Sequence, residues 1–351
     1  MKLKQVMKHD MTQFGVTIVI KHVKLNKIMQ TYIKKIDKNN WRGVKVREML
    51  DYNYKAFWNN LTTFRTDLGD VKELPCDYSE FYDVSLGTIC DACCDFCYVS
   101  AKKDGEAYKN PSETWKKWME TYRETLTKDG ILLTERPLQI AIGSEGEPCA
   151  TPYLCDFLKT VYETNVVPNY TTNGIVLSHW NKPESKYYAK ANEILDATKK
   201  YVGGVAVSYG NKSLRKYADN AIDGLLAKGD CHVMIHHIIS DNKSVDEFVK
   251  CWKKYGDKIR NHVLLPLMAS GRSKKGIEDG TFEYLENTIE TLGIKNAAFG
   301  AHFIKSLEKS HKIKTWIYPA ETYSKNVLLK ENEVVITSSS FNLTPVKVIK
   351  L

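Results

Sequence analysis

From about residue 80 onward, the chain alternates short runs rich in β-branched and aromatic residues with segments whose apolar residues recur at helical spacing. Alternation of this kind is typical of βα units that build a parallel sheet. Strands are predicted at seven places: Phe81–Gly87, Leu138–Ile142, Val167–Thr172, Val202–Ser208, His232–Ile239, Val263–Met268 and Ala297–Ile304.

Helices are predicted between these strands. Asn110, Pro111 and Glu113 open the first helix, with proline in the first turn and an early acid that favours the helix dipole. Three helices show clear apolar stripes: Trp115, Trp118, Met119, Tyr122 and Leu126; Leu154, Phe157, Leu158, Val161 and Tyr162; and Val245, Phe248, Val249 and Trp252. Six or seven consecutive βα units predict an α/β fold, a full or partial (β/α) barrel with its active site at the carboxyl ends of the strands.

Two segments fall outside this rhythm. The N-terminal segment, before residue 80, contains a β-like stretch, Gly15–Val23, and a basic amphipathic helix from about Leu25 to Ile36. The C-terminal segment holds no cysteine, and its pattern predicts a hairpin of Asn326–Leu329 and Val334–Thr337. We therefore expect a basic N-terminal extension over residues 1–80, a barrel over 81–305, and a C-terminal β-hairpin extension over 306–351.

Composition places the chain among globular proteins, because 43% of its 351 residues are apolar and 26% are charged. A disordered chain is excluded. The net charge of +9 is concentrated in residues 1–50, where twelve Lys and Arg face only three acids. Basic residues interleaved with Tyr32 and Trp41 suit a contact with RNA or DNA. A charge run is also typical of an ordinary solvated face, and both interpretations stay open.

The N-terminus is charged and has no apolar core of the signal-peptide kind. No later apolar run approaches the ~18 residues of a membrane span. These features predict a cytoplasmic protein that does not contact a membrane. The nine cysteines are an odd number in a chain without an export signal, which favours reduced thiols used for ligation or chemistry over disulfides.

Four of the nine cysteines lie directly after the first predicted strand. They include the spacing Cys90-x3-Cys94-x2-Cys97, with Phe96 before the last cysteine. Three thiolates in one loop can hold three irons of a [4Fe–4S] cluster and leave the fourth iron without a protein ligand. The alternative is zinc, but zinc sites made of two CxxC pairs separate the pairs by about 15–20 residues, and here Cys93 and Cys94 are adjacent.

With this motif the chain resembles the radical S-adenosylmethionine (radical SAM) superfamily, whose members carry C-x3-C-x-aromatic-C after the first barrel strand. Further motifs follow in order. Gly143–Pro148 is similar to the GGEP element after the second strand, and Thr172-Asn173-Gly174 ends the third. Ser208 ends the fourth, and the sixth leads into Gly271-Arg272. The resemblance covers residues 80 to about 275.

The resemblance implies a role for each matching residue. Cys90, Cys94 and Cys97 would ligate the cluster, while Cys93 has no counterpart. The residues implied to bind S-adenosylmethionine (SAM) are Phe96, Tyr98, Gly146, Glu147, Pro148, Asn173, Ser208, Arg215 and Met268. Among these, Gly146 and Glu147 would meet the SAM amine, the Tyr98 backbone the adenine, and Ser208 the ribose. Arg215 would pair with the SAM carboxylate.

Each role has a plainer alternative. Glu147 is otherwise a solvated loop acid, Ser208 a strand-end hydroxyl and Arg215 a surface arginine. His236 is a candidate catalytic residue, because strand residues alternate between the two faces and the outer face should be apolar under the helices. A core histidine with satisfied hydrogen bonds is the alternative. Cys149, after Glu147-Pro148, is expected to be a small buried residue rather than a ligand.

The implied activity is reductive cleavage of SAM at a [4Fe–4S] cluster, giving a 5′-deoxyadenosyl radical that abstracts hydrogen from a substrate. Such an enzyme, of oxidoreductase or transferase type, needs an external one-electron donor such as flavodoxin or ferredoxin. The substrate is expected to be a peptide, a protein or a nucleic-acid derivative. No cysteine follows Cys251, which excludes auxiliary clusters held by C-terminal cysteines. The competing hypotheses are an iron–sulfur electron carrier that does not cleave SAM, and an RNA- or DNA-modifying radical enzyme that uses the basic N-terminus.

Overall fold

The computed structural model describes only part of the chain: residues 34–35, 81–122, 124–126, 131–134, 136–137, 139–164, 166–303, 306, 325–339 and 342–351. Within these ranges, one sheet of ten strands has the order β10-β9-β8-β7-β6-β5-β2-β11-β12-β13. The strands are β2 (Phe81–Ser85), β5 (Gln139–Ile142), β6 (Val167–Thr172), β7 (Gly204–Ser208), β8 (His232–Ile239), β9 (Asn261–Pro266), β10 (Ala297–Phe299), β11 (Lys325–Lys330), β12 (Glu333–Ser339) and β13 (Asn342–Lys350).

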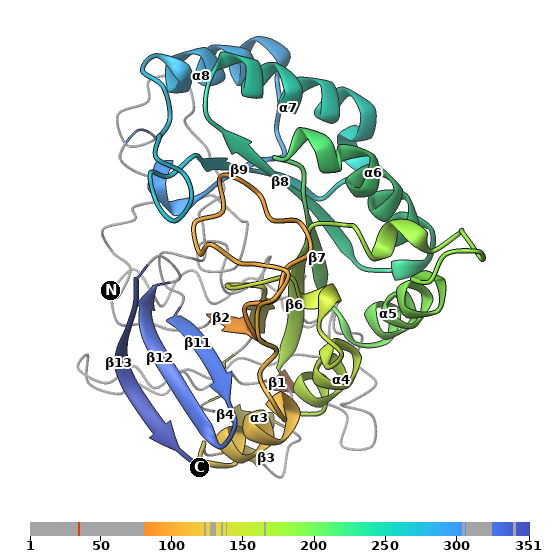
Figure 1. Ribbon diagram of the computed structural model, residues 1–351, viewed down its shortest axis with the longest axis vertical. Helices are drawn as coiled ribbons and strands as arrows, with labels where there is room; N and C mark the ends of the chain where they lie inside the picture. The colour runs from red at the N-terminus through yellow and green to blue at the C-terminus, as the bar shows by residue number, and fades with distance from the viewer. Residues whose placement is uncertain are drawn as a thin grey trace.

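Helices connect the strands from β2 to β10 and form an arc along one face of the sheet (Figure 1). They are α3 (Pro111–Glu120), α4 (Leu154–Glu163), α5 (Tyr188–Tyr201), α6 (Arg215–Gly224), α7 (Asn242–Tyr255) and α8 (Thr281–Leu292). All neighbouring strands from β11 to β10 pair in parallel. In the described part of the chain β10 pairs only with β9, so the sheet does not close. The expected α/β fold is confirmed, as a partial barrel.

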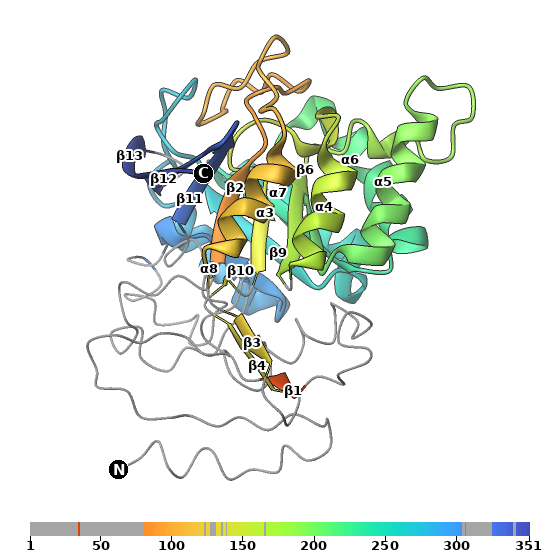
Figure 2. The ribbon, with the colours of Figure 1, turned by 90° about the horizontal axis from the view of Figure 1, so that it is seen from below.

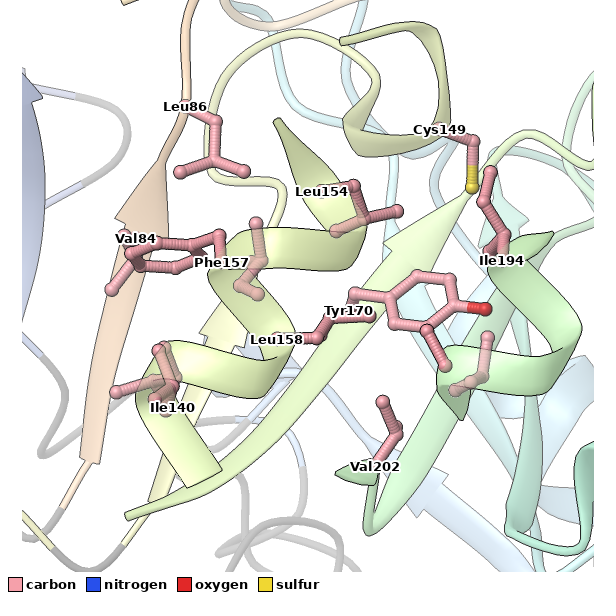
Figure 3. Close-up of a cluster of buried hydrophobic side chains, with 14 of the residues drawn as sticks. Val84, Leu86, Ile140, Cys149, Leu154, Phe157, Leu158, Tyr170, Ile194 and Val202 are labelled. Carbon is pink, nitrogen blue, oxygen red and sulfur yellow. The ribbon is translucent and has the colours of Figure 1, made fainter. Parts of the chain in front are cut away.

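The outer face of the sheet carries the main core. Val84, Ile140 and Tyr170 project from successive strands toward the helices and are buried. Figure 3 shows them around α4, whose Phe157 and Leu158 face the sheet. Trp115 and Trp118 of α3 extend this cluster, their rings meeting edge to face with centroids 5.5 Å apart. The helical stripes in the sequence mark this interface correctly up to Glu120, where α3 ends. The first stripe was expected to continue to Leu126, and this is wrong because Glu124–Leu126 form a strand.

The chain ends contribute differently from the prediction. β12 and β11 form the predicted hairpin, and β13 adds a third antiparallel strand that was not predicted. β11 pairs in parallel with β2, opposite Tyr82 to Ser85, so the C-terminal segment continues the barrel sheet.

Little of residues 1–80 lies within the described residues. Lys34–Lys35 form a two-residue strand, β1, that pairs with β4 (Ile131–Thr134). The prediction of a helix is wrong at these two residues, because they are extended and paired. β4 also pairs with β3 (Glu124–Leu126), giving a separate small sheet. The β-like stretch Gly15–Val23 and the rest of the basic segment lie outside the described residues.

The loop that follows β2 extends beyond the carboxyl ends of the barrel strands (Figure 2, orange). It contains the four neighbouring cysteines. Among the described residues, no helix is long and apolar enough to cross a membrane.

Candidate active site

The predicted site residues gather at one edge of the sheet because parallel strands end together. The cysteine loop follows β2, Gly146, Glu147 and Pro148 follow β5, and Asn173 follows β6. Ser208 is the last residue of β7, and Met268 lies two residues beyond β9. The predicted motifs therefore lie side by side in the order in which their strands neighbour one another in the sheet. At this edge a barrel holds its active site.

Cys90, Cys94 and Cys97 are half-buried, whereas Cys93 is exposed and has the left-handed φ of 49°. All eight described cysteines are free thiols. The loop is fixed by its own backbone: the Cys90 amide donates to the Lys102 carbonyl over 2.8 Å, and the Cys97 amide donates to the Cys94 carbonyl over 3.2 Å. The loop thus presents three thiols and turns the fourth outward.

The donor set fits an iron–sulfur cluster. The Asn211 side-chain amide donates to the Cys94 sulfur over 3.3 Å, which is the kind of hydrogen bond that tunes cluster thiolates. Burial raises the pKa of Cys90 to about 11, so the thiol needs a bound metal to lose its proton. The three sulfurs are not within reach of a single ion, as expected for ligands of different irons in one cube.

A clamp from the β9 loop holds the cysteine loop in place. The Arg272 side chain donates to the Cys94 carbonyl over 2.7 Å and to the Ala101 carbonyl over 2.8 Å, and its amide donates to the Cys97 carbonyl. Gly271, at φ +60°, precedes it, and a Cβ there would lie 2.3 Å from the Cys97 carbonyl oxygen. Only glycine permits this approach of the two backbones.

Glu147 is buried rather than solvated, with 4% of its surface exposed. Its carboxylate accepts from the Cys149 amide (3.0 Å), the Thr172 hydroxyl (2.8 Å) and the Asn173 amide (2.6 Å). Burial nevertheless raises its pKa to about 7. The Cys149 side chain is a further hydrogen-bonding neighbour of this carboxyl group. The alternative of a solvated loop acid is wrong.

Gly146 and Asn173 tie this acid to the cysteine loop. Gly146 has φ +62°, and a Cβ there would lie 2.6 Å from the carbonyl oxygens of both Gly87 and Ile89. The Asn173 amide group donates to Asp91 of the cysteine loop over 2.7 Å. The loops after β2, β5 and β6 consequently form one hydrogen-bonded unit.

The neighbouring residues of the β5 loop are already engaged. Tyr98 donates its hydroxyl to the Ser144 carbonyl over 2.8 Å. Glu145 is buried and accepts from the Tyr108 hydroxyl over 3.0 Å. Pro148 begins a short 3-10 helix, Pro148–Ala150. Cys149 is fully buried and lies between α4 and α5 (Figure 3), which confirms the expectation of a small core residue.

The inner face of the sheet is polar near its carboxyl edge. Ser208 is exposed and stands beside His236 of β8 in the strand register. His236 is half-buried on the same face as Met234, whereas Val233 and Ile235 pack under the helices. Burial lowers the pKa of His236 to about 4. The structure thus places a neutral imidazole and a hydroxyl together on the concave side.

The Arg215 side chain is already paired with an acid. It forms an ion pair with Glu247 of α7, and its guanidinium lies 5.7 Å from the centre of the Tyr209 ring. It lines a cavity of about 210 Å³ together with Phe96, Tyr209, Lys212, His237 and Glu247. Phe96 therefore faces this cavity, at the ends of β7 and β8. Met268 is half-buried in the loop that leads to Gly271.

The sequence does not single out Asn211 or Asp91 as residues of this edge. It also does not indicate that the Thr172 hydroxyl donates a hydrogen bond to Glu147. Asn211 and Asp91 are short polar residues in loops, with no periodicity to set them apart. Arg272 was noted as part of a motif, but its contact with a loop 178 residues earlier was not. Long-range contacts of this kind leave no local signal in the sequence.

No protein-family model matches the chain, and no curated protein sequence matches it significantly. Solved structures to which it is similar include SuiB of Streptococcus suis bound to S-adenosylmethionine, at 14% identity and a TM-score of 0.47 over 74% of this chain and 60% of that one. SuiB bound to the precursor peptide SuiA shows 15% identity and a TM-score of 0.49, over 74% of this chain and 59% of that one. BtrN in complex with AdoMet and 2-DOIA shows 15% identity and a TM-score of 0.29, over 45% of this chain and 56% of that one. The chain spans about three fifths of the length of these structures, and what SuiB and BtrN bind is a property of those proteins.

Proposed function

We propose that this chain is a radical SAM enzyme that holds a [4Fe–4S] cluster through Cys90, Cys94 and Cys97. The observation that carries the proposal is the geometry of the cysteine loop. It lies at the carboxyl edge of a parallel sheet, presents three thiols and receives an N–H···S bond from Asn211. When bound, the cluster would supply the electron that cleaves SAM to methionine and a 5′-deoxyadenosyl radical.

The chain's own residues would bind and orient SAM. Glu147 would accept from the SAM amine, and Gly146 lets the backbone come close. Ser208 would donate to the ribose from the open end of β7, and the Tyr98 backbone would meet the adenine. Arg215 would pair with the SAM carboxylate, in exchange for or in addition to Glu247. Phe96, Pro148, Asn173 and Met268 would shape the surrounding walls.

His236 would position the substrate. Its low pKa keeps the imidazole neutral at pH 7, so the ring can donate one hydrogen bond and accept another. We propose a peptide, a protein or a nucleic-acid derivative as the substrate, and a flavodoxin or ferredoxin as the electron donor. A nucleic acid that binds the basic N-terminal segment would lose affinity steeply as salt is added.

The test is anaerobic reconstitution with iron and sulfide, followed by reduction with dithionite in the presence of SAM. We expect 5′-deoxyadenosine from the wild type and none from Cys94→Ala, because this variant removes one of the three iron ligands. Cys93→Ala is the matched control, since Cys93 is exposed on the same loop, and it should retain both iron and product.

Two results would contradict the proposal. A reduced wild-type protein that holds a cluster and forms no 5′-deoxyadenosine would be an iron–sulfur carrier. Equal product from the wild type and Cys94→Ala would show that the cysteine loop is not the site of cleavage.

A further inference from the structure

The layer between the sheet and α7 contains three metal-binding side chains where apolar residues are expected. His237 of β8, Cys251 of α7 and His262 of β9 are 3%, 2% and 0% exposed. Phe248 packs against both imidazoles, with ring centroids 5.2 and 5.9 Å away. Burial of polar groups in such surroundings is unfavourable unless partners satisfy them. A hydrogen bond between the two imidazoles satisfies only one nitrogen of each ring.

The three ligand atoms converge on one point. His237 Nε2 and His262 Nδ1 are 3.1 Å apart, and one ring nitrogen of each histidine lies within 4.8 Å of the Cys251 sulfur. In a tetrahedral zinc site, bond lengths of ~2.0–2.1 Å to nitrogen and ~2.3 Å to sulfur put two nitrogens about 3.3 Å apart and a nitrogen and a sulfur about 3.6 Å apart. The 3.1 Å between His237 Nε2 and His262 Nδ1 is close to the first value, and the distance from the sulfur to a ring nitrogen exceeds the second by about 1.2 Å at most.

The chemistry of the three groups agrees with this geometry. The neutral imidazole is the form of histidine that binds metal. A bound cation removes the proton of a coordinating thiol outright. Two imidazoles and one thiolate select a borderline first-row ion such as zinc over magnesium or calcium, which prefer oxygen.

We propose that His237, Cys251 and His262 bind a zinc ion that joins α7 to β8 and β9. His237 also lines the cavity of about 210 Å³ at the ends of β7 and β8, and a water molecule from this cavity completes the four ligands. The site does not depend on the proposed SAM chemistry. His237 and His262 project from the outer face of the sheet, under α7, whereas Ser208 and His236 occupy the concave face.

The experiment uses the full chain, freed of metal by a chelator and then given Zn²⁺ alone. Zinc per chain after desalting is measured by mass spectrometry, and the midpoint of thermal unfolding is recorded with and without Zn²⁺. We expect about one zinc per chain and a midpoint several degrees higher in the wild type. Cys94→Ala should behave in the same way, because it disables only the cysteine loop.

Cys251→Ala tests the ligand set. A buried cysteine packs as a small apolar residue, so alanine preserves the fold while it removes the sulfur. We expect zinc affinity to fall by at least tenfold and the zinc-dependent midpoint shift to vanish. Cys155→Ser, at a half-buried cysteine of α4, is the control. It should keep the zinc affinity and the zinc-dependent midpoint shift of the wild type. Co²⁺ should give a thiolate charge-transfer band in Cys94→Ala that is weaker in Cys94→Ala/Cys251→Ala.

Three results would overturn the proposal. One is a wild type that takes up no zinc, and another is Cys251→Ala with the zinc affinity of the wild type. The third is binding of copper without zinc, since two histidines and one cysteine are also the ligands of blue-copper sites.

Discussion

At the residue scale, the hydrogen bonds of Glu147 favour its charged form and its burial disfavours that form. The carboxylate accepts three hydrogen bonds that connect the β5 and β6 loops. A cationic ligand beside this side chain would stabilise the carboxylate. The protonation of this side chain is thereby linked both to folding and to the proposed SAM amine.

This linkage predicts a pH effect on stability. The folded pKa of about 7 lies above the ordinary glutamate value of 4.5, so the folded state holds the proton more tightly. The contribution of Glu147 is therefore fully present below pH 4.5 and declines as the pH rises through 7, by on the order of 3 kcal/mol. In the cluster-free Cys94→Ala background, Glu147→Gln should remove this slope from the unfolding midpoint. An identical pH slope with and without Glu147→Gln would contradict it.

At the element scale, the sequence predicted the strands and helices of the barrel well. β6 and β8 have the predicted limits, Val167–Thr172 and His232–Ile239, because each is a β-rich run bounded by turns. β9 begins and ends two residues earlier than expected, since a continuous apolar run does not mark its own end. β13 was missed because its side chains are mostly exposed and follow no apolar alternation.

The same reasoning explains what was predicted of the site. Cysteine spacing is a local signal, so the loop was found. Its fastening is not local: Asn211, Asn173 and Arg272 reach it from 117, 82 and 178 residues away. The outer face of the strands was expected to be apolar. His237 and His262 are polar residues on this face, and they satisfy each other by a hydrogen bond across neighbouring strands.

The β9 loop provides a sharp test of this fastening. Gly271→Ala places a Cβ 2.3 Å from the Cys97 carbonyl oxygen at a left-handed φ, so the loop must move away and Arg272 must lose its contacts. We expect less iron per chain after reconstitution and faster loss of the cluster to a chelator. Gly276→Ala is the control, because its Cβ would meet nothing closer than 3.7 Å. Equal iron retention in the two variants would show that the close approach is dispensable.

At the scale of the whole molecule, the C-terminal strands cover an edge of the sheet. β11 pairs with β2, the strand that leads into the cysteine loop, and Val327 lies opposite Val84. Val327, Leu329 and Val334 are fully buried in the main core. The far side of this addition is open, since Val346 and Val348 of β13 are 70% and 46% exposed.

The hairpin should therefore contribute to the stability of the barrel. Leu329→Ala removes a fully buried side chain and should lower the free energy of unfolding by about 2–5 kcal/mol. Val346→Ala alters an exposed side chain of the same extension and should change it by at most about 0.5 kcal/mol. Chemical unfolding of the cluster-free Cys94→Ala chain measures both. Equal effects would mean that the hairpin is attached to the barrel without supporting it.

The fastening of the cysteine loop also determines the order in which the molecule matures. The thiols at residues 90–97 leave the ribosome early, but Arg272 follows 178 residues after Cys94. Translation adds about 5–20 residues per second, so the loop waits on the order of ten seconds or more for its last clamp. A cluster inserted before then would meet a loop that lacks its contacts with Arg272. Loading of the proposed cluster is accordingly expected to be a late step, which follows pairing of the strands from β2 to β9.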